Sequence, residues 1–590
     1  MKKKARDFFR RSISTFFTRP KITMETSHQH QHQQRYSYNP TLRWNPEVES
    51  YLSNAYGPAH FSRISKALTR PSCYSCIRVN TLKSTPDFVI EKLRGILEGV
   101  SICKCQVPGL EYLVFVKGSG PHSVDYGCDE DGNVKHPPKE VLVSRKCAEA
   151  VLRGAEVYVP GVLACSAHVE KGDEVAVSVS VEQPGAEGGW VVGITRGTIL
   201  QGAETDPYHF ERSGLYIGRG KAMMSRSGIF RAPEGIAVDF SDRVYDLPSF
   251  RGVLEGEIFL QNLPSIVTAH ALDPQKGDRI LDMCAAPGGK TTAIAILMKD
   301  EGEIVAADRS HNKVLDIQKL AAEMGLSCIT TCRLDALKAV CSRNESDNIT
   351  NHCCTEDSCD VTIQGSNLLK SEVEKIEVIA TERLNAEKDF KKNVTNEKAN
   401  ERIYISRADI RKDMRRKRNG PGRNQSVGGK AEKSKGFAPN SFDRVLLDAP
   451  CSALGLRPRL FAGEETVESL RKHAKYQRKM FDQAVQLVRP GGVLVYSTCT
   501  INPGENEAVV RYALDTYKFL SLASQNPRIG GPGLVGRFEF PDGYTEEWLR
   551  PGQEELVQRF DPSSPLDTIG FFIAKFIVGS KEADLEQSAT

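Results

Sequence analysis

The sequence has no run of about 18 consecutive apolar residues, the length that a membrane-crossing helix needs. We therefore expect no membrane-spanning segment. It also lacks a strong excess of one charge, because the formal net charge is only +4. A surface for nucleic acid would have to be a local patch. The 16 cysteines in 590 residues do not make a disulfide framework, which favours a reducing compartment.

Two common nucleotide-binding motifs are missing as well. Residues 278–292 predict a strand, a glycine turn and a helix over 291–298. Backbone N–H groups at such a turn can bind a carboxylate or a phosphate. A phosphate loop of the form G-x-x-x-x-G-K-[ST] would need glycine where Cys284 stands, and the dinucleotide motif G-x-G-x-x-G is absent. The remaining alternative for this turn is S-adenosylmethionine.

Acidic residues at the ends of the next strands support this alternative. Asp308 closes the predicted strand 303–308, where a carboxylate suits ribose hydroxyls, and Asp335 would lie toward the adenine. Gln261 and Ser265 either face the cofactor or are ordinary helix-start residues. The residues expected to bind the cofactor belong to the turn and to strand ends: Cys284, Ala285, Ala286, Pro287, Gly288, Gly289, Lys290, Asp308, Asp335 and Asp448.

Two further apolar runs, at 445–452 and 493–500, stop at polar turns that carry Cys451 and Cys499. Such runs are typical of buried parallel strands, and a helix predicted over 467–488 separates them. Ligands and chemistry gather at the carboxyl ends of parallel strands, so both thiols are expected at the same edge of one sheet. Two thiols at one edge indicate chemistry that needs a soft nucleophile.

The motifs D-x-C-A-A-P-G-G-K-T, D-A-P-C-S and S-T-C-T-x-x-x-x-E-N-E occur here in one order. In this the chain resembles the Sun-type RNA 5-methylcytosine methyltransferases, from about residue 78 to residue 575 except for one insertion. The resemblance implies S-adenosylmethionine as cofactor. It also implies an α/β fold with a doubly wound, parallel-sheet, Rossmann-like class I methyltransferase domain.

The resemblance also implies roles for four residues. Carbon 5 of cytosine becomes nucleophilic only after a thiolate adds to carbon 6, so the site needs a thiolate, a proton donor and a base. The family's nucleophile corresponds to Cys499, and Cys451 assists proton removal or enzyme release. Asp448 can face both the base and the methyl donor, and Lys290 is the nearest cation. A helix beginning near 502–507 is expected to lower the pKa of Cys499.

Residues 141–224 differ from the rest of the chain in their short apolar runs separated by glycines. A helix over 148–155 ends at a glycine, and strands at 157–162, 173–179 and 189–195 alternate with glycine turns, which predicts a small barrel. The segment resembles a PUA domain, a module that binds structured RNA. A scaffold barrel without a ligand is the alternative. Backbone donors and cations at 216–221 suit phosphates.

The resemblance places the PUA domain inside a small amino-terminal α/β domain, which begins with helices after residue 43, a strand at 78–81 and a helix over 87–98. The expected order is a disordered tail (1–40), the first part of the amino-terminal domain (41–138), the PUA domain (139–224), the return of the amino-terminal domain (225–270) and the methyltransferase domain (271–580), with a disordered insertion at about 342–437.

Several biased segments allow more than one interpretation. The basic start, residues 1–34, is a disordered tail, an extension before a true start at Met24, or a transit peptide. The basic run 411–418 is a nuclear localisation signal, an RNA-binding arm or a solvated loop. The histidine tract 28–32, the cysteines near residue 353 and the C-x-x-C at 73–76 are weak metal motifs, and we expect no metal.

These observations favour an S-adenosylmethionine-dependent enzyme that forms 5-methylcytosine in structured RNA, either tRNA or ribosomal RNA. The target base must be single-stranded or flipped out. One alternative is an RNA-binding ribosome assembly factor that has lost catalysis, and another is DNA as substrate. We expect a monomer in the nucleus or nucleolus, with the cytoplasm or an organelle as alternatives.

Overall fold

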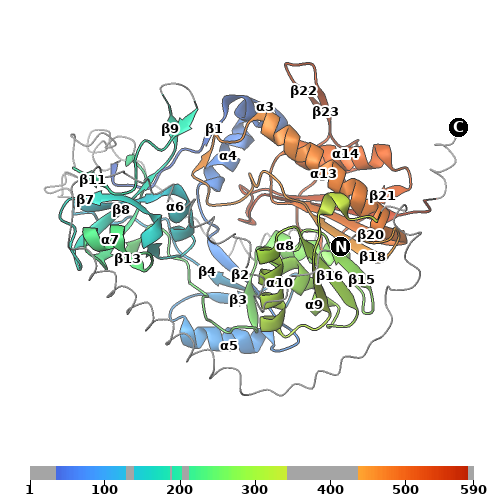
Figure 1. Cartoon of the computed structure of the whole chain (residues 1–590), viewed down its shortest axis with the longest axis horizontal. Helices are drawn as coiled ribbons and strands as arrows, with labels where there is room; N and C mark the ends of the chain where they lie inside the picture. Colours follow the sequence, from blue (N-terminus) through green and yellow to red (C-terminus); the bar gives the residue numbers. More distant parts are fainter. Residues whose placement is uncertain (1–34, 128–137, 186–188, 202–211, 342–435, 582–590) are drawn as a thin grey trace, which may run out of the picture. The chain divides into compact units, whose positions relative to one another are not determined.

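The protein is described by a computed structural model covering residues 35–127, 138–185, 189–201, 212–341 and 436–581 (Figure 1). The histidine tract, the cysteines near residue 353 and the basic run 411–418 lie outside the described residues. Within the described ranges, no helix has both the length and the apolar character needed to cross a membrane.

The main sheet lies in the carboxyl-terminal half of the chain. Its strands run in the order β17-β16-β15-β18-β20-β25-β21, and β24 also pairs with β25. Their bounds are β15 (Arg279–Asp282), β16 (Glu303–Asp308), β17 (Ile329–Arg333), β18 (Phe442–Asp448), β20 (Val488–Thr498), β21 (Leu520–Leu522), β24 (Val557–Phe560) and β25 (Phe571–Val578). β15 pairs in parallel with both β16 and β18, so the strand order reverses there. The predicted doubly wound, mostly parallel sheet is confirmed.

Both faces of this sheet are covered by helices. Ile280 of β15 packs in the core with α8 and α9, whereas its neighbour Leu281 packs in the opposite core with α13 and α14. Burial on both faces explains why these strands read as continuous apolar runs instead of alternating patterns. The covering helices are α8 (Leu263–Leu272), α9 (Gly289–Leu297), α10 (His311–Met324), α13 (Val467–Leu487) and α14 (Glu507–Thr516), and Figure 1 shows α13 and α14 together in orange.

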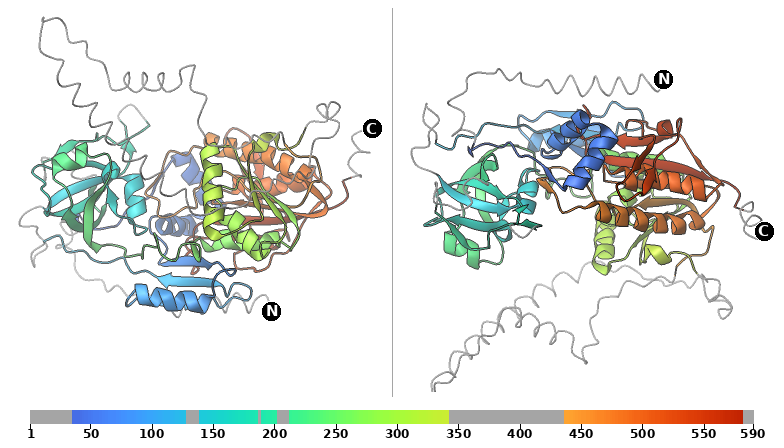
Figure 2. Two further views of the ribbon diagram at one scale, coloured as in Figure 1. Left: turned by 60° about the horizontal axis from the view of Figure 1, so that its bottom comes forward. Right: turned by 90° about the horizontal axis from the view of Figure 1, so that it is seen from above.

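A smaller antiparallel sheet, ordered β14-β2-β4-β3, precedes the main sheet in the chain. Its strands are β2 (Tyr74–Val79), β3 (Ile102–Lys104), β4 (Leu113–Lys117) and β14 (Ile258–Leu260). The helix α5 (Pro86–Ile96) buries Val89 and Leu93 against it. The left view of Figure 2 shows this blue helix alongside the strands of the small sheet. The helices α3 (Pro46–Tyr56) and α4 (Pro58–Leu68) come before this sheet.

The third sheet is a mixed one, ordered β11-β7-β5-β8-β12-β13-β6, around a valine-rich core. Its strands are β5 (Lys139–Ser144), β6 (Val157–Tyr158), β7 (Val162–Ser166), β8 (Glu174–Ser180), β11 (Thr198–Leu200), β12 (Tyr216–Ala222) and β13 (Ile236–Arg243), with the helices α6 (Arg145–Val151) and α7 (Arg226–Arg231). It forms the curled half-barrel expected of a PUA-like domain.

Three boundaries differ from the sequence-based prediction. The third sheet continues to Arg243, past residue 224, because β13 pairs with β12. The predicted strand 189–195 supplies only β10 (Trp190–Val191), which pairs with β9 (Gln183–Pro184) outside the sheet. The predicted tail, residues 1–40, reaches too far, since Tyr38 bridges to Leu215.

The third sheet is inserted between β4 and β14, two strands of the small sheet that β2 separates within that sheet. The chain leaves β4 and comes back to β14, and the isolated bridge between Ser119 and Asp246 joins the outgoing and returning segments. The inserted sheet also packs on the loop after Cys451, because Leu460 and Phe461 belong to its core. That loop is fixed from the other side by β19 (Phe461–Ala462), which pairs with β1 (Arg43–Trp44).

Candidate active site

The two predicted thiols meet at one edge of the main sheet. β18 and β20 are parallel neighbours, with Asp448 opposite Ser497, so the turns that follow them lie side by side. The Sγ atoms of Cys451 and Cys499 are 3.4 Å apart, within the distance of a thiol hydrogen bond. Both side chains are partly buried and neither forms a disulfide. The prediction that both thiols lie at the carboxyl end of the sheet is confirmed.

The environment of the two thiols separates their proton affinities. The hydrogen bond from the Cys451 thiol lowers the pKa of Cys499, and the nearby Lys290 ammonium acts in the same direction. That same hydrogen bond, together with burial, raises the pKa of Cys451 well above its usual range. These opposite shifts favour the thiolate at Cys499 over the thiolate at Cys451. The sequence pointed instead to the helix after Cys499, but that helix, α14, begins only at Glu507 and the neighbouring thiol is the largest cause.

Asp448 and Lys290 lie beside the thiols as an ion pair. The Lys290 Nζ lies 2.8 Å from one carboxylate oxygen of Asp448, and the Ser497 hydroxyl donates to the other over 2.7 Å. Both side chains are mostly buried. The carboxylate therefore has a fixed orientation between the glycine turn and the cysteine-bearing strand.

A cavity of about 360 Å³ opens beside the glycine turn. Its lining includes most of the residues predicted to hold the cofactor: Cys284, Ala285, Ala286, Pro287, Gly289, Lys290 and Asp448. Gly288 adopts a positive φ of 104°, which glycine tolerates, and this lets the chain turn tightly into α9. A Cβ on Gly289 would lie 3.0 Å from the Phe259 ring, so the backbone approaches the cavity wall closely.

One unpartnered oxygen in the cavity wall bears on the cofactor. Asp282 lines the cavity and is buried; its Oδ2 accepts from Thr291, but its Oδ1 has no hydrogen-bond partner. Burial raises the pKa of this carboxyl to about 7. An acceptor left without a donor suits the ammonium group of an amino-acid ligand, so the donor set fits S-adenosylmethionine.

The two strand-end acids lie at the predicted edge but outside the lining of that cavity. Asp308 ends β16 and accepts from the Ser310 backbone N–H over 3.0 Å. Asp335 follows β17 and accepts from the Leu337 N–H over 3.2 Å. The structure therefore places them on neighbouring strand ends, and their contact with a cofactor stays a prediction.

Arg78 was missed as a site residue. Its side chain is fully buried, and it donates to Gln261 over 2.8 Å and to the Thr292 hydroxyl over 2.7 Å. It thus joins the small sheet to the first turn of α9. Gln261 also donates to Ser265, and both line the cavity, which favours the cofactor-side alternative for these two residues.

Three buried polar residues next to the site were also missed as candidate site residues: Asp282, Gln477 and Glu505. Asp282 stands at the start of the first motif and Glu505 in the last, so the motifs themselves were the available signal. Gln477 lies in the middle of α13 and has no local sequence signature. The assembled site offers two neighbouring thiols with oppositely shifted pKa values and a fixed carboxylate next to a ligand cavity. This combination is suited to nucleophilic addition followed by group transfer.

Comparisons with known proteins agree with this geometry. The model of the 16S rRNA methyltransferase RsmB/F family matches residues 269–355 and 372–576, and the PUA domain model matches residues 139–186. The rRNA (cytosine-C(5))-methyltransferase NOP2C of Arabidopsis thaliana is 65% identical over 97% of this chain and 98% of that protein. The human tRNA (cytosine(72)-C(5))-methyltransferase NSUN6 is 31% identical over 91% of this chain and 98% of its own length.

Among solved structures, NSun6 from Pyrococcus horikoshii with SFG has a TM-score of 0.60 and 27% identity, covering 91% of this chain and 99% of that one. The resemblance noted in the motifs is therefore confirmed over nearly the whole length. The chain belongs to the RsmB/F family of S-adenosylmethionine-dependent RNA cytosine-C5 methyltransferases, among the members that carry a PUA domain.

Proposed function

We propose that Cys499 is the nucleophile of this methyltransferase and that Cys451 manages the proton and releases the product. The supporting observation is the 3.4 Å separation of two thiols whose pKa values are shifted in opposite directions. Cys499 is set to react as a thiolate, and Cys451 keeps its proton. A site with two equivalent thiols would not separate these roles.

The proposed sequence of steps assigns one task to each residue. The Cys499 thiolate adds to carbon 6 of a flipped-out cytosine, which makes carbon 5 nucleophilic. Bound S-adenosylmethionine supplies the methyl group as a sulfonium. Asp448, fixed by Lys290 and Ser497, accepts a hydrogen bond from the cytosine amino group and orients the ring. Cys451 donates its proton toward ring N3 as Cys499 adds, and the resulting Cys451 thiolate then removes the carbon 5 proton. The bond between carbon 6 and Cys499 finally breaks, and Cys499 leaves as a thiolate.

The order of bond making and breaking provides the test. Cys499→Ala should abolish both turnover and the covalent protein–RNA adduct. Cys451→Ala should be nearly inactive in turnover but should accumulate an adduct that survives denaturing electrophoresis. Each variant is incubated with S-adenosylmethionine and labelled RNA and then run on a denaturing gel. An adduct on Cys499→Ala with none on Cys451→Ala would reverse the two roles.

For the substrate we propose ribosomal RNA rather than tRNA. The 65%-identical Arabidopsis relative, matched over 98% of its length, is named for rRNA, whereas the relative named for tRNA is 31% identical. The test uses RNA from cells that lack the protein. Purified enzyme and labelled cofactor are offered the ribosomal and the tRNA fractions separately, and incorporation into tRNA alone would overturn the choice.

We further propose that the PUA domain docks this RNA, that the enzyme acts as a monomer, and that it works in the nucleus or nucleolus. Support for docking comes from β12, where Arg219 and the exposed Lys221 stand on the same strand.

The basic run 411–418 supports nuclear import. A fluorescent fusion with and without that run tests the compartment, and light scattering with and without RNA tests the monomer.

A further inference from the structure

The Glu505 carboxylate is fully buried at the end of a 3-10 turn, Pro503–Glu505, that follows the Cys499 strand. One of its oxygens accepts from the Ser452 N–H over 2.9 Å and from Gln477 Nε2 over 2.8 Å. The other accepts from Asn502 Nδ2 over 3.0 Å and from the Ser452 hydroxyl. All four donors are neutral groups. A buried carboxylate held only by neutral donors is costly, so packing alone does not explain it.

The four donors come from the two cysteine-bearing turns and from one helix. Ser452 directly follows Cys451, and Asn502 lies on the turn that follows Cys499. Gln477 of α13 donates to the Pro450 carbonyl over 3.0 Å as well as to Glu505. The Glu505 carboxylate therefore holds the Cys451 turn, the Cys499 turn and α13 against one another.

Only an ionised carboxylate can accept from all four donors. Each of its oxygens has two lone-pair sites, and it carries no hydrogen of its own. Glutamine would have the same shape, but its amide nitrogen would face two donors and could accept from neither. Loss of the charge at this position should therefore loosen the turns without leaving a cavity.

We propose that Glu505 is a positioning residue that holds the Cys451 thiol in register with Cys499, acting through Ser452. This rests on the roles of the two thiols proposed above. Glu505 touches neither the substrate nor the cofactor in this scheme. Its effect on the reaction comes from the placement of Cys451, whose release step needs a short and constant distance to Cys499.

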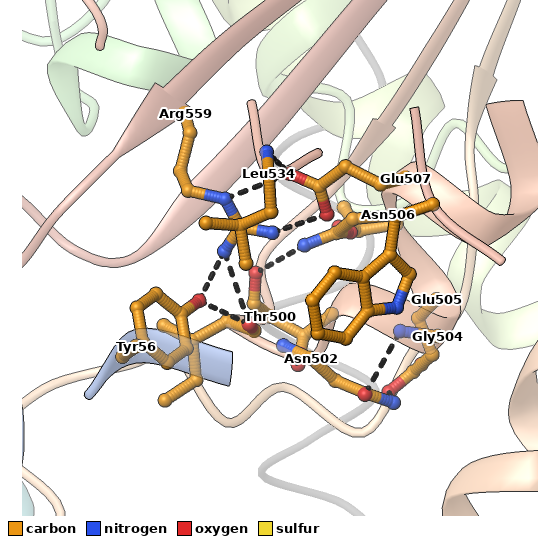
Figure 3. Close-up of polar contacts among 12 residues, drawn as sticks. Tyr56, Thr500, Asn502, Gly504, Glu505, Asn506, Glu507, Leu534 and Arg559 are labelled. Atoms are coloured by element: carbon orange, nitrogen blue, oxygen red, sulfur yellow. Dashed lines mark hydrogen bonds and ion pairs between the residues drawn. The ribbon is translucent and has the colours of Figure 1, made fainter. Parts of the chain in front are cut away.

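Glu507 provides a matched control because it is equally buried and lies two residues further along the same motif. Figure 3 shows it facing Arg559 and Leu534. Its carboxylate accepts from Arg559 Nε over 2.9 Å and from the Leu534 N–H over 3.0 Å, so its own bonds reach neither cysteine-bearing turn. Its partner Arg559 also donates to the Ile501 carbonyl over 3.0 Å, a contact that Glu507→Gln does not remove. Glu507→Gln should therefore lower thermal stability while keeping kcat within about threefold of wild type, since all four donors to Glu505 remain.

The experiment compares Glu505→Gln, Glu507→Gln, Cys451→Ala and Cys499→Ala as full-length proteins, by thermal midpoint, cofactor Kd, kcat, KM for RNA and adduct yield. Below its thermal midpoint, Glu505→Gln should lose kcat by about 10- to 100-fold with KM and cofactor Kd nearly unchanged. It should also accumulate part of the adduct seen with Cys451→Ala. A purely structural role would not produce that adduct.

Ser452→Ala tests the same proposal with a smaller change, should Glu505→Gln not fold. It removes the hydroxyl that donates to Glu505 and contacts Thr500 at 2.8 Å. Ser452→Ala should lower kcat and raise adduct yield. The double variant Ser452→Ala/Glu505→Gln should lose no more kcat than Glu505→Gln alone, because both changes act on the same contact. Two results would overturn the positioning role. One is a wild-type kcat in folded Glu505→Gln, and the other is a loss of kcat in Glu507→Gln as large as in Glu505→Gln, with no adduct. Turnover by Cys499→Ala would instead overturn the thiol assignment on which it rests.

Discussion

At the scale of single residues, the reactivity of Cys499 comes from its immediate neighbours. The largest cause of its lowered pKa is the hydrogen bond from Cys451, while burial and the Asp448 charge act in the opposite direction. The Lys290 ammonium offsets part of that opposition. The thiolate is therefore favoured by one removable contact, which a single substitution can test.

Replacing Cys451 by alanine should raise the pKa of Cys499, because the hydrogen bond that stabilises its thiolate is lost. The rate at which iodoacetamide modifies Cys499 should then rise at higher pH than in wild type, as followed by peptide mass spectrometry. Cys341, which is exposed, serves as the internal reference. An unchanged pH midpoint would mean that Lys290 alone sets the thiolate.

A second residue-scale prediction concerns Asp282. Burial raises the pKa of its carboxyl to about 7, so in the free protein it is largely protonated below that pH and ionised above it. A cationic ammonium needs the ionised form. Affinity for S-adenosylmethionine should therefore fall as pH drops below about 7, by up to about tenfold per pH unit. Calorimetry from pH 6 to 8.5 checks this, and Asp282→Asn should bind weakly with no such slope.

Sequence motifs identified the cysteines, Asp448 and Lys290 because each sits at a strand end or a glycine turn, where position along the chain indicates position in the sheet. Gln477 could not be found that way. Its side-chain amide donates hydrogen bonds to the Pro450 carbonyl and to Glu505, and both bonds depend on how α13 packs. Buried polar contacts between distant segments depend on tertiary packing, which local patterns do not contain.

At the scale of elements, the parallel strands were the most predictable, because burial on both faces requires continuous apolar runs. The predicted strand over residues 189–195 was less successful: only Trp190–Val191 forms a strand, and it lies outside the sheet. Trp190 packs instead against Phe461, with ring centroids 4.8 Å apart. A long-range aromatic contact of this kind overrides the local preference for a regular strand.

The described residues on either side of the segment 342–435 lie next to each other, which allows an element-scale prediction. Val340 and Phe437 form a parallel bridge, and the Cys341 N–H donates to the Phe437 carbonyl over 2.9 Å. A short glycine linker can therefore replace the residues between them. Deleting residues 344–435 should leave the thermal midpoint within about 2 °C and turnover intact, because the bridge and the core around it remain. Calorimetry and a methylation assay check both, and a collapse of the midpoint would show that the segment stabilises the fold.

At the scale of the whole molecule, the inserted PUA-like sheet should be separable from catalysis. The Ser119–Asp246 bridge brings the outgoing and returning segments together, so cutting between residues 121 and 244 and joining the ends keeps the small sheet closed. Ending the deletion at residue 224 would leave β13 without its partner β12. The fold thus gives a cleaner boundary than the sequence did.

The protein without residues 121–244 should keep its cofactor affinity and lose most of its RNA affinity, because phosphate contacts position the substrate. It should also be less stable, since Leu460 and Phe461 lose their cover at a cost of ~1.5–3 kcal/mol each. Filter binding at several salt concentrations and calorimetry check the two expectations. Methylation of RNA as efficient as that of the full-length protein would contradict the docking role.

The inserted sheet also constrains the order in which the chain can fold during synthesis. Ile258 of β14 pairs with Val79 of β2. The small sheet therefore cannot gain its edge strand β14 until the whole insertion has left the ribosome. All seven strands of the inserted sheet lie between residues 139 and 243, so it can close first. Pairings so distant along the chain form slowly. Until β14 arrives, β2 presents an open edge, which makes the nascent amino-terminal part a natural client for chaperones that shield unpaired strands.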